Sequence, residues 1–278
     1  MLRVGRCTYD KGKRIDPKYP GYKSILVMMK SHSNYWSLSP YYLKDEKGYI
    51  FENIWQACKL YEKVPKSVQY YSQYDKRVIW QYPFEVHLTK EFKLTPAYFN
   101  WRKELMENEY AVRYPVGYSH RHKCLYSLLS KENGYDLTSF PGTLEKLDYV
   151  EARKRIYQPV YQKLARQQPL YQKLLTSLTK GENLLIIEVD GPHSESLPYY
   201  QEKYSVTRDF IDNETMLVTE QNLDIMLNDE KHCYGHGYCL AAALYSNFLS
   251  LSVKKMTRTI YYTQVVSFSI LHLPKKLS

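Results

Sequence analysis

The sequence predicts an α+β fold that is mostly helical and contains a small β-sheet. Apolar residues recur at helical spacing throughout the block 148–179. A short apolar run over 184–189 is typical of a buried strand. The Leu- and Ala-rich run that begins at Tyr238 consists of strong helix formers. Together these patterns indicate helices packed around a few strands.

One domain accounts for most of the chain. The 278 residues are 44% hydrophobic and 24% charged, values that are typical of globular proteins and argue against disorder. No Gly/Ser-rich or Pro-rich linker and no repeat divides the chain. We therefore predict a single domain over residues 1–249 with a variable insertion near 130–147. A basic C-terminal tail or strand pair is expected over 250–278.

The first half of the chain contains one well-marked helix. We expect an extended segment over 35–42, followed by a turn in which Gly48 takes a positive φ. A helix should then run over 51–63 and stop before Pro65. A second, short helix is predicted over 101–108.

The second half combines a helical block with the predicted strand. Pro159 and Pro169 interrupt the block 148–179, which therefore contains two or three consecutive helices. Gly181 is well placed to cap the last of them. The strand over 184–189 follows directly and ends at a turn.

Charge favours an anionic partner. The 39 Lys and Arg residues exceed the 29 Asp and Glu residues, so the formal net charge is +10. Such a balance suits nucleic acid, a nucleotide or phosphate. The 30 tyrosines are spread along the chain. Where they alternate with basic residues they could stack on bases.

Cysteine usage and apolar runs predict the compartment. Five cysteines, an odd number placed far apart, argue against a disulfide framework and favour a reducing compartment. Residues 1–23 contain no apolar signal segment. The apolar runs 24–29 and 260–273 are shorter than the roughly 20 residues that span a bilayer. We expect a cytoplasmic protein without a membrane partner.

The helix predicted over 51–63 has one stripe of polar side chains. At about 100° per residue, Glu52, Gln56 and Lys59 fall on one side and the opposite stripe is apolar. Trp55 lies at the border between the two stripes. One interpretation is a solvated face with acid and base side chains at helical spacing. The other is a functional stripe that faces a site.

A carboxylate interrupts the apolar strand. Alternation places Glu188 and Asp190 on the same face as Leu184 and Ile186. A buried carboxylate is normally paired with a cation, exposed at a sheet edge, or used as an acid or base. A structural glutamate and a functional glutamate therefore both remain open.

A glycine motif precedes the helix that begins near Tyr238. The sequence Gly235-His236-Gly237 would expose backbone amides at a helix N-terminus, which suits phosphate. The segments 120–124 and 232–239 contain enough His and Cys for a tetrahedral zinc site, but neither has the paired spacing of a zinc ribbon or finger. We predict neither a metal nor a cofactor.

Five segments occur in an order that is known from one protein family. They are Leu38–Pro40, Glu52–Lys59, Tyr161–Leu175, Gly181–Glu188 and Gly235–Leu244. This order resembles the NADAR family, the YbiA-like N-glycosidases, and extends over most of residues 38–244. The resemblance implies a YbiA-like α+β fold.

The resemblance also implies a reaction, hydrolysis of a C–N ribosyl bond. The substrate would be a phosphorylated ribosylamino-pyrimidine or ADP-ribose attached to a guanine base, and both are anionic. Such cleavage develops oxocarbenium charge on the ribose, which a carboxylate can stabilise. Glu52 is the first candidate for this role, and Glu188 with the nearby Asp190 is the second. Gln56 and Lys59 would orient ribose hydroxyls or phosphate.

The remaining roles concern the base and the phosphate. Trp55 would stack on the base, while the amides near Gly235 and Gly237, together with His236, would hold a phosphate. A second hypothesis, from a different functional class, is a basic, Tyr-rich nucleic-acid-binding protein without catalytic activity.

Overall fold

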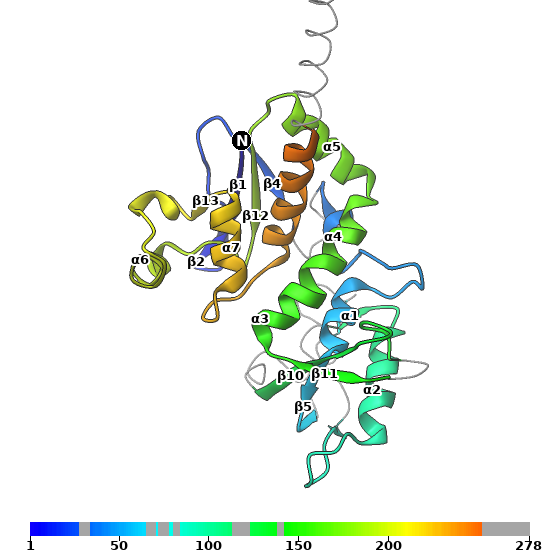
Figure 1. Ribbon diagram of the computed structural model, residues 1–278. Helices are drawn as coiled ribbons and strands as arrows, with labels where there is room; N and C mark the ends of the chain where they lie inside the picture. The colour runs from blue at the N-terminus through cyan, green and yellow to red at the C-terminus, as the bar shows by residue number, and fades with distance from the viewer. Residues whose placement is uncertain are drawn as a thin grey trace, which may run out of the picture.

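A computed structural model describes residues 1–27, 34–64, 71, 78–79, 84–112, 123–137 and 142–251. Within these ranges helices and several small sheets occur together, so the predicted α+β fold class is confirmed (Figure 1). The helices are α1 (Phe51–Ala57), α2 (Pro96–Met106), α3 (Tyr149–Ala152), α4 (Gln158–Arg166), α5 (Pro169–Thr179), α6 (Leu197–Tyr204), α7 (Glu220–Asn228) and a helix over 236–251. Shorter helical turns are η1 (Trp36–Leu38), η3 (Arg153–Tyr157), η4 (Ser194–Ser196) and η5 (Arg208–Phe210). The strands are β1 (Leu2–Arg6), β2 (Thr8–Asp10), β3 (Lys13–Ile15), β4 (Lys23–Leu26), β5 (Lys59–Tyr61), β6 (Lys63–Val64), β7 (Val78–Ile79), β8 (Glu85–Val86), β9 (Ala111–Val112), β10 (Cys124–Ser130), β11 (Leu144–Leu147), β12 (Leu184–Glu188) and β13 (Thr215–Leu217).

A four-stranded sheet in the order β13-β1-β12-β4 organises one half of the molecule. Strands β1 and β4 run parallel to β12, so all three end at the same edge of the sheet. Every residue of β12 is buried, as the sequence predicted for this strand. Leu184 and Ile186 face the main apolar core, and Leu185 and Ile187 face a smaller cluster on the other side. The predicted alternation therefore places Glu188 on the main-core side.

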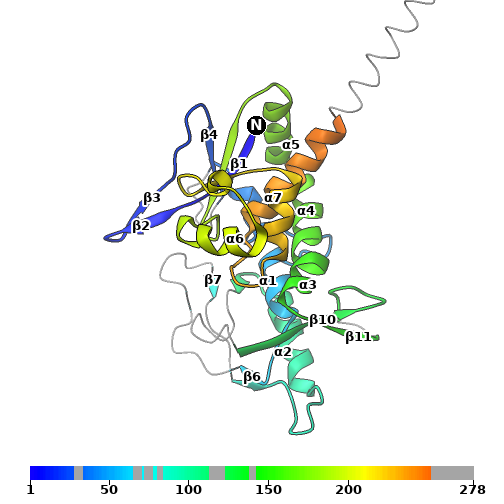
Figure 2. The ribbon, with the colours of Figure 1, turned by 60° about the vertical axis from the view of Figure 1, so that its left-hand side comes forward.

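Helices α4, α5 and 236–251 cover this sheet (Figure 1) and share one apolar cluster with it. The predicted run of helices over 148–179 is confirmed as α3, η3, α4 and α5. Gly181 has a φ of 89° and donates its N–H to the carbonyl of Leu178 at 3.0 Å, so the predicted cap is also confirmed. On the far side, β2 and β3 form a ribbon that projects from the molecule (Figure 2).

Helix α1 lies between two apolar clusters. Phe51 and Trp55 belong to the cluster around the four-stranded sheet, whereas Ile54 and Ala57 belong to a second cluster with α2 and the sheet β11-β10-β5. All seven residues of α1 are therefore buried. The predicted helix over 51–63 was too long, because the chain leaves α1 to pair with β10 as β5.

Two other boundaries also differ from prediction. The segment 35–42 is not extended, because the amide of Leu38 bonds to Tyr35 O at 3.0 Å and closes the turn η1. The helix predicted over 101–108 begins earlier, at Pro96, where the Thr95 side chain accepts a hydrogen bond from the amide of Tyr98. The turn at Gly48 is confirmed by a φ of 84°.

The predicted insertion and tail are only partly described. The segment 130–147 includes β11, which pairs with β10 in an antiparallel hairpin. Residues 138–141 and 252–278 lie outside the described residues, and the helix over 236–251 includes the first two positions of the predicted tail. The limits of the single domain stay a prediction. All five cysteines are free thiols. No helix in the described ranges has the length and apolar composition needed to cross a bilayer.

A buried histidine makes stability depend on pH. The His87 ring is fully buried, and its centroid lies 4.6 Å from that of Trp101. Burial lowers its pKa from 6.5 to about 4. Between these two values the unfolded chain binds more protons than the folded chain, so stability falls as the pH is lowered. The full loss is roughly 3 kcal/mol.

Urea unfolding of the wild type and of His87→Phe at pH 7 and pH 4.5 measures this contribution. Phenylalanine keeps the aromatic packing but does not titrate. The wild type should lose more stability than the variant over this interval. Equal losses in the two proteins would show that His87 is not responsible.

Candidate functional site

The polar side chains of α1 form a chain of hydrogen bonds that continues to Lys59, the first residue of β5. Glu52 is only 6% exposed and Gln56 only 2%. Gln56 Nε2 donates to Glu52 Oε1 at 2.8 Å, and Lys59 Nζ donates to Gln56 Oε1 at 2.9 Å. Lys59 Nζ also lies 5.1 Å from the centroid of the Trp55 ring. The solvated-face interpretation of this stripe is therefore wrong for Glu52 and Gln56.

The surroundings of Lys59 alter its basicity. Burial lowers the pKa of Lys59, and the nearby thiol of Cys124 and carboxylate of Glu52 oppose part of this shift. Lys59 is therefore easier to deprotonate than a lysine in water. A group of this kind can exchange protons with a bound substrate as well as attract its negative charge.

Glu188 forms a second buried group at the edge where the parallel strands end. This carboxylate is 1% exposed, and its Oε2 lies 3.0 Å from His236 Nδ1. The other ring nitrogen of His236 lies 2.6 Å from the carbonyl oxygen of Val27, which follows β4. Because both nitrogens face acceptors, the ring is best satisfied as an imidazolium that donates twice. Burial opposes this charge, but Glu188 and the Val27 carbonyl raise the pKa of His236 overall.

The glycine motif is packed against the same carboxylate. A Cβ on Gly235 would lie 2.0 Å from Glu188 Oε1, and one on Gly237 would lie 3.0 Å from Glu188 Cγ. Only a residue without a side chain fits at Gly235 while Glu188 keeps this position. Glu188 Oε1 has no hydrogen-bond partner among the described residues. Phosphate binding by Gly235, His236 and Gly237 stays a prediction.

Aromatic side chains join the two groups. The Tyr157 ring centroid lies 4.8 Å from that of Trp55. Burial raises the pKa of Tyr157, and the carboxylates of Glu52, Glu188 and Asp190 raise it further. Tyr157 also packs on Phe51, and Phe51 on Tyr161, with centroid separations of 5.1 and 5.5 Å. The Tyr161 ring centroid lies 6.1 Å from that of His236, so these rings connect Trp55 to the histidine that holds Glu188. Asp190 is half-buried.

Sequence reasoning predicted helices here but missed the helix face that links these groups. Tyr149, Arg153, Tyr157 and Tyr161 recur at every fourth position, a spacing that could have marked them as one helix face. One π-helical turn, η3, lies within this series. Such turns are frequent at functional sites. Tyr149 faces Trp55 with a centroid separation of 6.4 Å.

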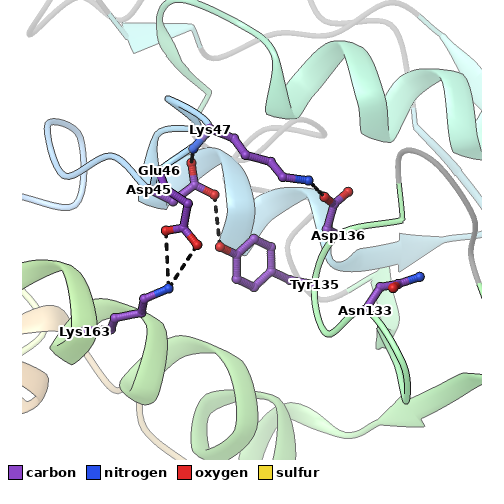
Figure 3. A pocket seen from close by; sticks show the side chains of 7 residues that line it. All are labelled: Asp45, Glu46, Lys47, Asn133, Tyr135, Asp136 and Lys163. Carbon is purple, nitrogen blue, oxygen red and sulfur yellow. Dashed lines mark hydrogen bonds and ion pairs between the residues drawn. The ribbon is translucent and has the colours of Figure 1, made fainter.

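A surface pocket of about 570 Å³ is lined by none of the predicted site residues (Figure 3). Its lining consists of Asp45, Glu46, Lys47, Asn133, Tyr135, Asp136 and Lys163. Both lysines already have carboxylate partners, Lys47 with Asp136 and Lys163 with Glu46 at 3.1 Å. These ion pairs leave the pocket without a surplus of positive charge, so it is a poor site for the anionic substrates considered above.

The zinc candidates of the sequence have no counterpart among the described residues. In these ranges no group of three or more His, Cys, Asp or Glu side chains is arranged to hold an ion. His120 and His122 of the first zinc candidate lie outside the described residues. In the second candidate, His232 is hydrogen-bonded to Ser196 and Asp229.

Three comparisons with known proteins found no match. No family model matches the sequence, no curated protein is similar to it, and no solved structure matches the fold. Any function must therefore be argued from the geometry of the site.

The close approach of Gly235 to Glu188 leads to a stability prediction. Gly235→Ala should destabilise the protein by about 1–3 kcal/mol, because the added methyl group forces Glu188 or the backbone to move. Gly237→Ala, with a longer closest approach, should cost less. Urea unfolding of both variants tests this order. If both variants are as stable as the wild type, Glu188 moves to accommodate the methyl group without a measurable cost in stability.

Proposed function

We propose that this chain is an N-glycosidase that hydrolyses a C–N ribosyl bond. Its substrate is a phosphorylated ribosylamino-pyrimidine or an ADP-ribosylated guanine base. The observation that carries the proposal is a row of aromatic contacts that links two buried carboxylates from distant elements. It runs from Trp55, on the same helix as Glu52, to His236, the partner of Glu188. The motif order that resembles the NADAR family supports the same reaction.

The first carboxylate suits stabilisation of the cationic transition state. Gln56 fixes one oxygen of Glu52 through a 2.8 Å hydrogen bond, and Lys59 in turn fixes Gln56. A carboxylate held in this way can face the oxocarbenium charge on the ribose without reorganising. The electron pair of the breaking C–N bond leaves with the base nitrogen, which then takes up a proton.

The second carboxylate suits activation of water. Glu188 Oε2 is held by His236, while its Oε1 has no hydrogen-bond partner among the described residues. An oxygen of this kind can accept a proton from a water molecule as that water attacks the ribose C1′. The nucleobase of the substrate would stack on Trp55. The net charge of +10 favours the approach of an anionic substrate.

A release assay with the purified protein tests the proposal and distinguishes the two substrates. The protein is incubated with DNA that contains ADP-ribosylated guanine and, separately, with ribosylamino-pyrimidine phosphate. Release of ADP-ribose or of ribose phosphate supports the reaction and identifies the substrate branch. Protein unfolded by heat is the blank.

Release from neither substrate would overturn the proposal. The alternative, a nucleic-acid-binding protein without activity, then predicts DNA affinity that falls steeply as salt is raised. Fluorescence anisotropy at two salt concentrations measures that dependence.

A further inference from the structure

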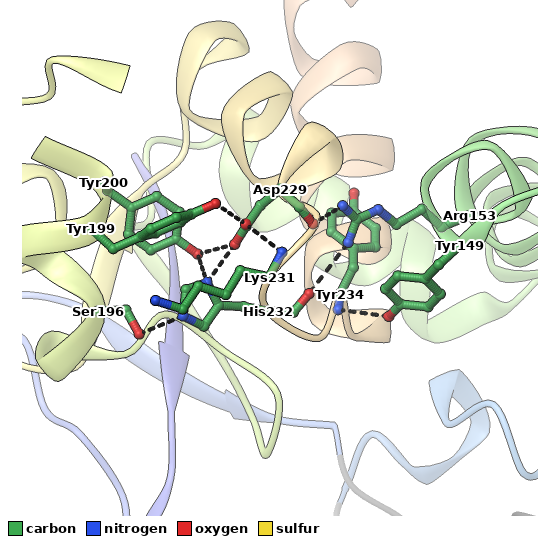
Figure 4. Close-up of polar contacts among 9 residues, drawn as sticks. All are labelled: Tyr149, Arg153, Ser196, Tyr199, Tyr200, Asp229, Lys231, His232 and Tyr234. Carbon is green, nitrogen blue, oxygen red and sulfur yellow. Dashed lines mark hydrogen bonds and ion pairs between the residues drawn. The ribbon is translucent and has the colours of Figure 1, made fainter. Parts of the chain in front are cut away.

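A second group of polar side chains surrounds His232 and includes none of the site residues predicted from the sequence (Figure 4). Ser196 Oγ lies 2.9 Å from His232 Nε2, and His232 Nδ1 lies 2.6 Å from Asp229 Oδ2. A hydroxyl, an imidazole and a carboxylate are thus joined through opposite ring nitrogens. This is the connectivity of a serine nucleophile with its base and the acid that orients the base.

The acid of this constellation is held as a carboxylate. Asp229 is 1% exposed and accepts hydrogen bonds from Tyr199 Oη at 2.9 Å, Tyr200 Oη at 2.5 Å and the Lys231 amide at 2.9 Å. Burial alone would raise the pKa of Asp229, but these donors and His232 lower it overall. The ring of His232 therefore has a permanent acceptor at Nδ1, which leaves Nε2 to accept the serine proton.

The base is fixed from both sides. Arg153 is buried and donates to the backbone carbonyls of Asp229 and His232, which holds the loop between them in one conformation. The rings of Tyr199 and Tyr200 lie 5.1 and 5.3 Å from the His232 ring, measured between centroids. Such packing restricts rotation of the imidazole.

Ser196 directs its hydroxyl toward this base although it occupies a helix end. It is the N-cap residue of α6, yet its side chain makes no capping hydrogen bond. Serine at this position usually bonds to a first-turn amide. The hydroxyl instead contacts His232, and both side chains are partly exposed to solvent.

We propose that Ser196, His232 and Asp229 form a second catalytic site, which hydrolyses small carboxylic esters. Ser196 Oγ attacks the acyl carbon and forms a C–O bond, while its proton moves to His232 Nε2. The bond to the leaving alcohol breaks and that alcohol takes the proton from Nε2. Water then repeats the sequence, which releases the carboxylic acid and restores Ser196. This activity does not depend on the proposed glycosidase reaction.

The substrate class follows from the surroundings of the serine. Tyr199 and Tyr200 lie with Asp229 at the Nδ1 end of His232. Ser196, at the Nε2 end, is partly exposed, so a small ester can reach its hydroxyl from solvent. The oxyanion of the tetrahedral intermediate forms next to the first turn of α6, whose positive end favours negative charge.

Covalent labelling with a fluorophosphonate probe tests the site. The probe transfers its phosphonyl group to an activated serine hydroxyl and releases fluoride. Intact-mass measurement and peptide mapping of the full-length protein should find one adduct, on Ser196. Ser196→Ala should remove the label, and His232→Gln should slow labelling at least about 100-fold.

The neighbouring Ser194 provides a matched control. It lies in the same turn, η4, and its hydroxyl accepts a hydrogen bond from the amide of Glu214 at 3.3 Å. Ser194→Ala should be labelled at the wild-type rate. Circular dichroism melts establish that each variant is folded. A folded wild type without label on Ser196, or equal labelling rates in wild type and His232→Gln, would overturn the proposal.

Discussion

Glu52→Gln should lower the rate of ribosyl release by a factor of about 10²–10⁴, the range typical for loss of a catalytic acid or base. The substitution removes the negative charge that would face the oxocarbenium ion. It keeps a side-chain oxygen that can accept the 2.8 Å hydrogen bond from Gln56. The melting temperature should therefore change little. Single-turnover release assays and thermal melts measure the two effects separately.

Glu62, a glutamate on the surface, provides the control for this substitution. Glu62 is exposed and lies five residues beyond the end of α1, so Glu62→Gln makes the same chemical change outside the candidate site. It should release product at the wild-type rate. Wild-type turnover by Glu52→Gln would mean that Glu52 has no catalytic role, whatever reaction the protein performs.

Glu188→Gln should destabilise the fold by about 3 kcal/mol and also abolish release. Removing one partner of a buried ion pair leaves the other charge without compensation. Here the remaining charge is His236, whose two ring nitrogens face Glu188 and the Val27 carbonyl. The loss should be larger at pH 5.5 than at pH 8, because at low pH the unfolded chain binds a proton at His236 that the folded variant, without Glu188, no longer stabilises.

A double-mutant cycle isolates this pair. His236→Gln and the double variant Glu188→Gln/His236→Gln are compared with the wild type by urea unfolding. The double variant should be less destabilised than the sum of the two single variants, because no uncompensated charge remains in it. Additive losses would show that Glu188 and His236 do not interact in solution.

Several elements could be predicted from local sequence patterns. The cap at Gly181, the strand β12 and the run of helices from α3 to α5 all occur where predicted. Each depends on signals within a few residues, namely a glycine that tolerates positive φ, an apolar run or a helical period. Side-chain alternation along this strand, with its period of two, also predicted that Glu188 lies on the same face as Leu184 and Ile186.

The end of α1 and the burial of its polar stripe could not be predicted in this way. Helix propensity continues past Ala57, but the chain there pairs with β10, which is more than 60 residues away along the sequence. A stripe with Glu52 and Gln56 also has the pattern of a solvated surface. It is buried because α1 lies between two apolar clusters. Those clusters are formed by elements distant in the chain, so the local sequence does not reveal them.

Local sequence identified the candidate site residues and most of the helices and strands that hold them, because hydrogen bonds within a helix and alternation along a strand are short-range effects. Tertiary packing decided which of those side chains meet. Aromatic contacts link the helix of Glu52 to the histidine that holds Glu188, and Ser196 bonds to a histidine 36 positions away, because the core aligns elements that are distant in the chain. Burial then determines how these groups behave, since desolvation and nearby charge control their basicity.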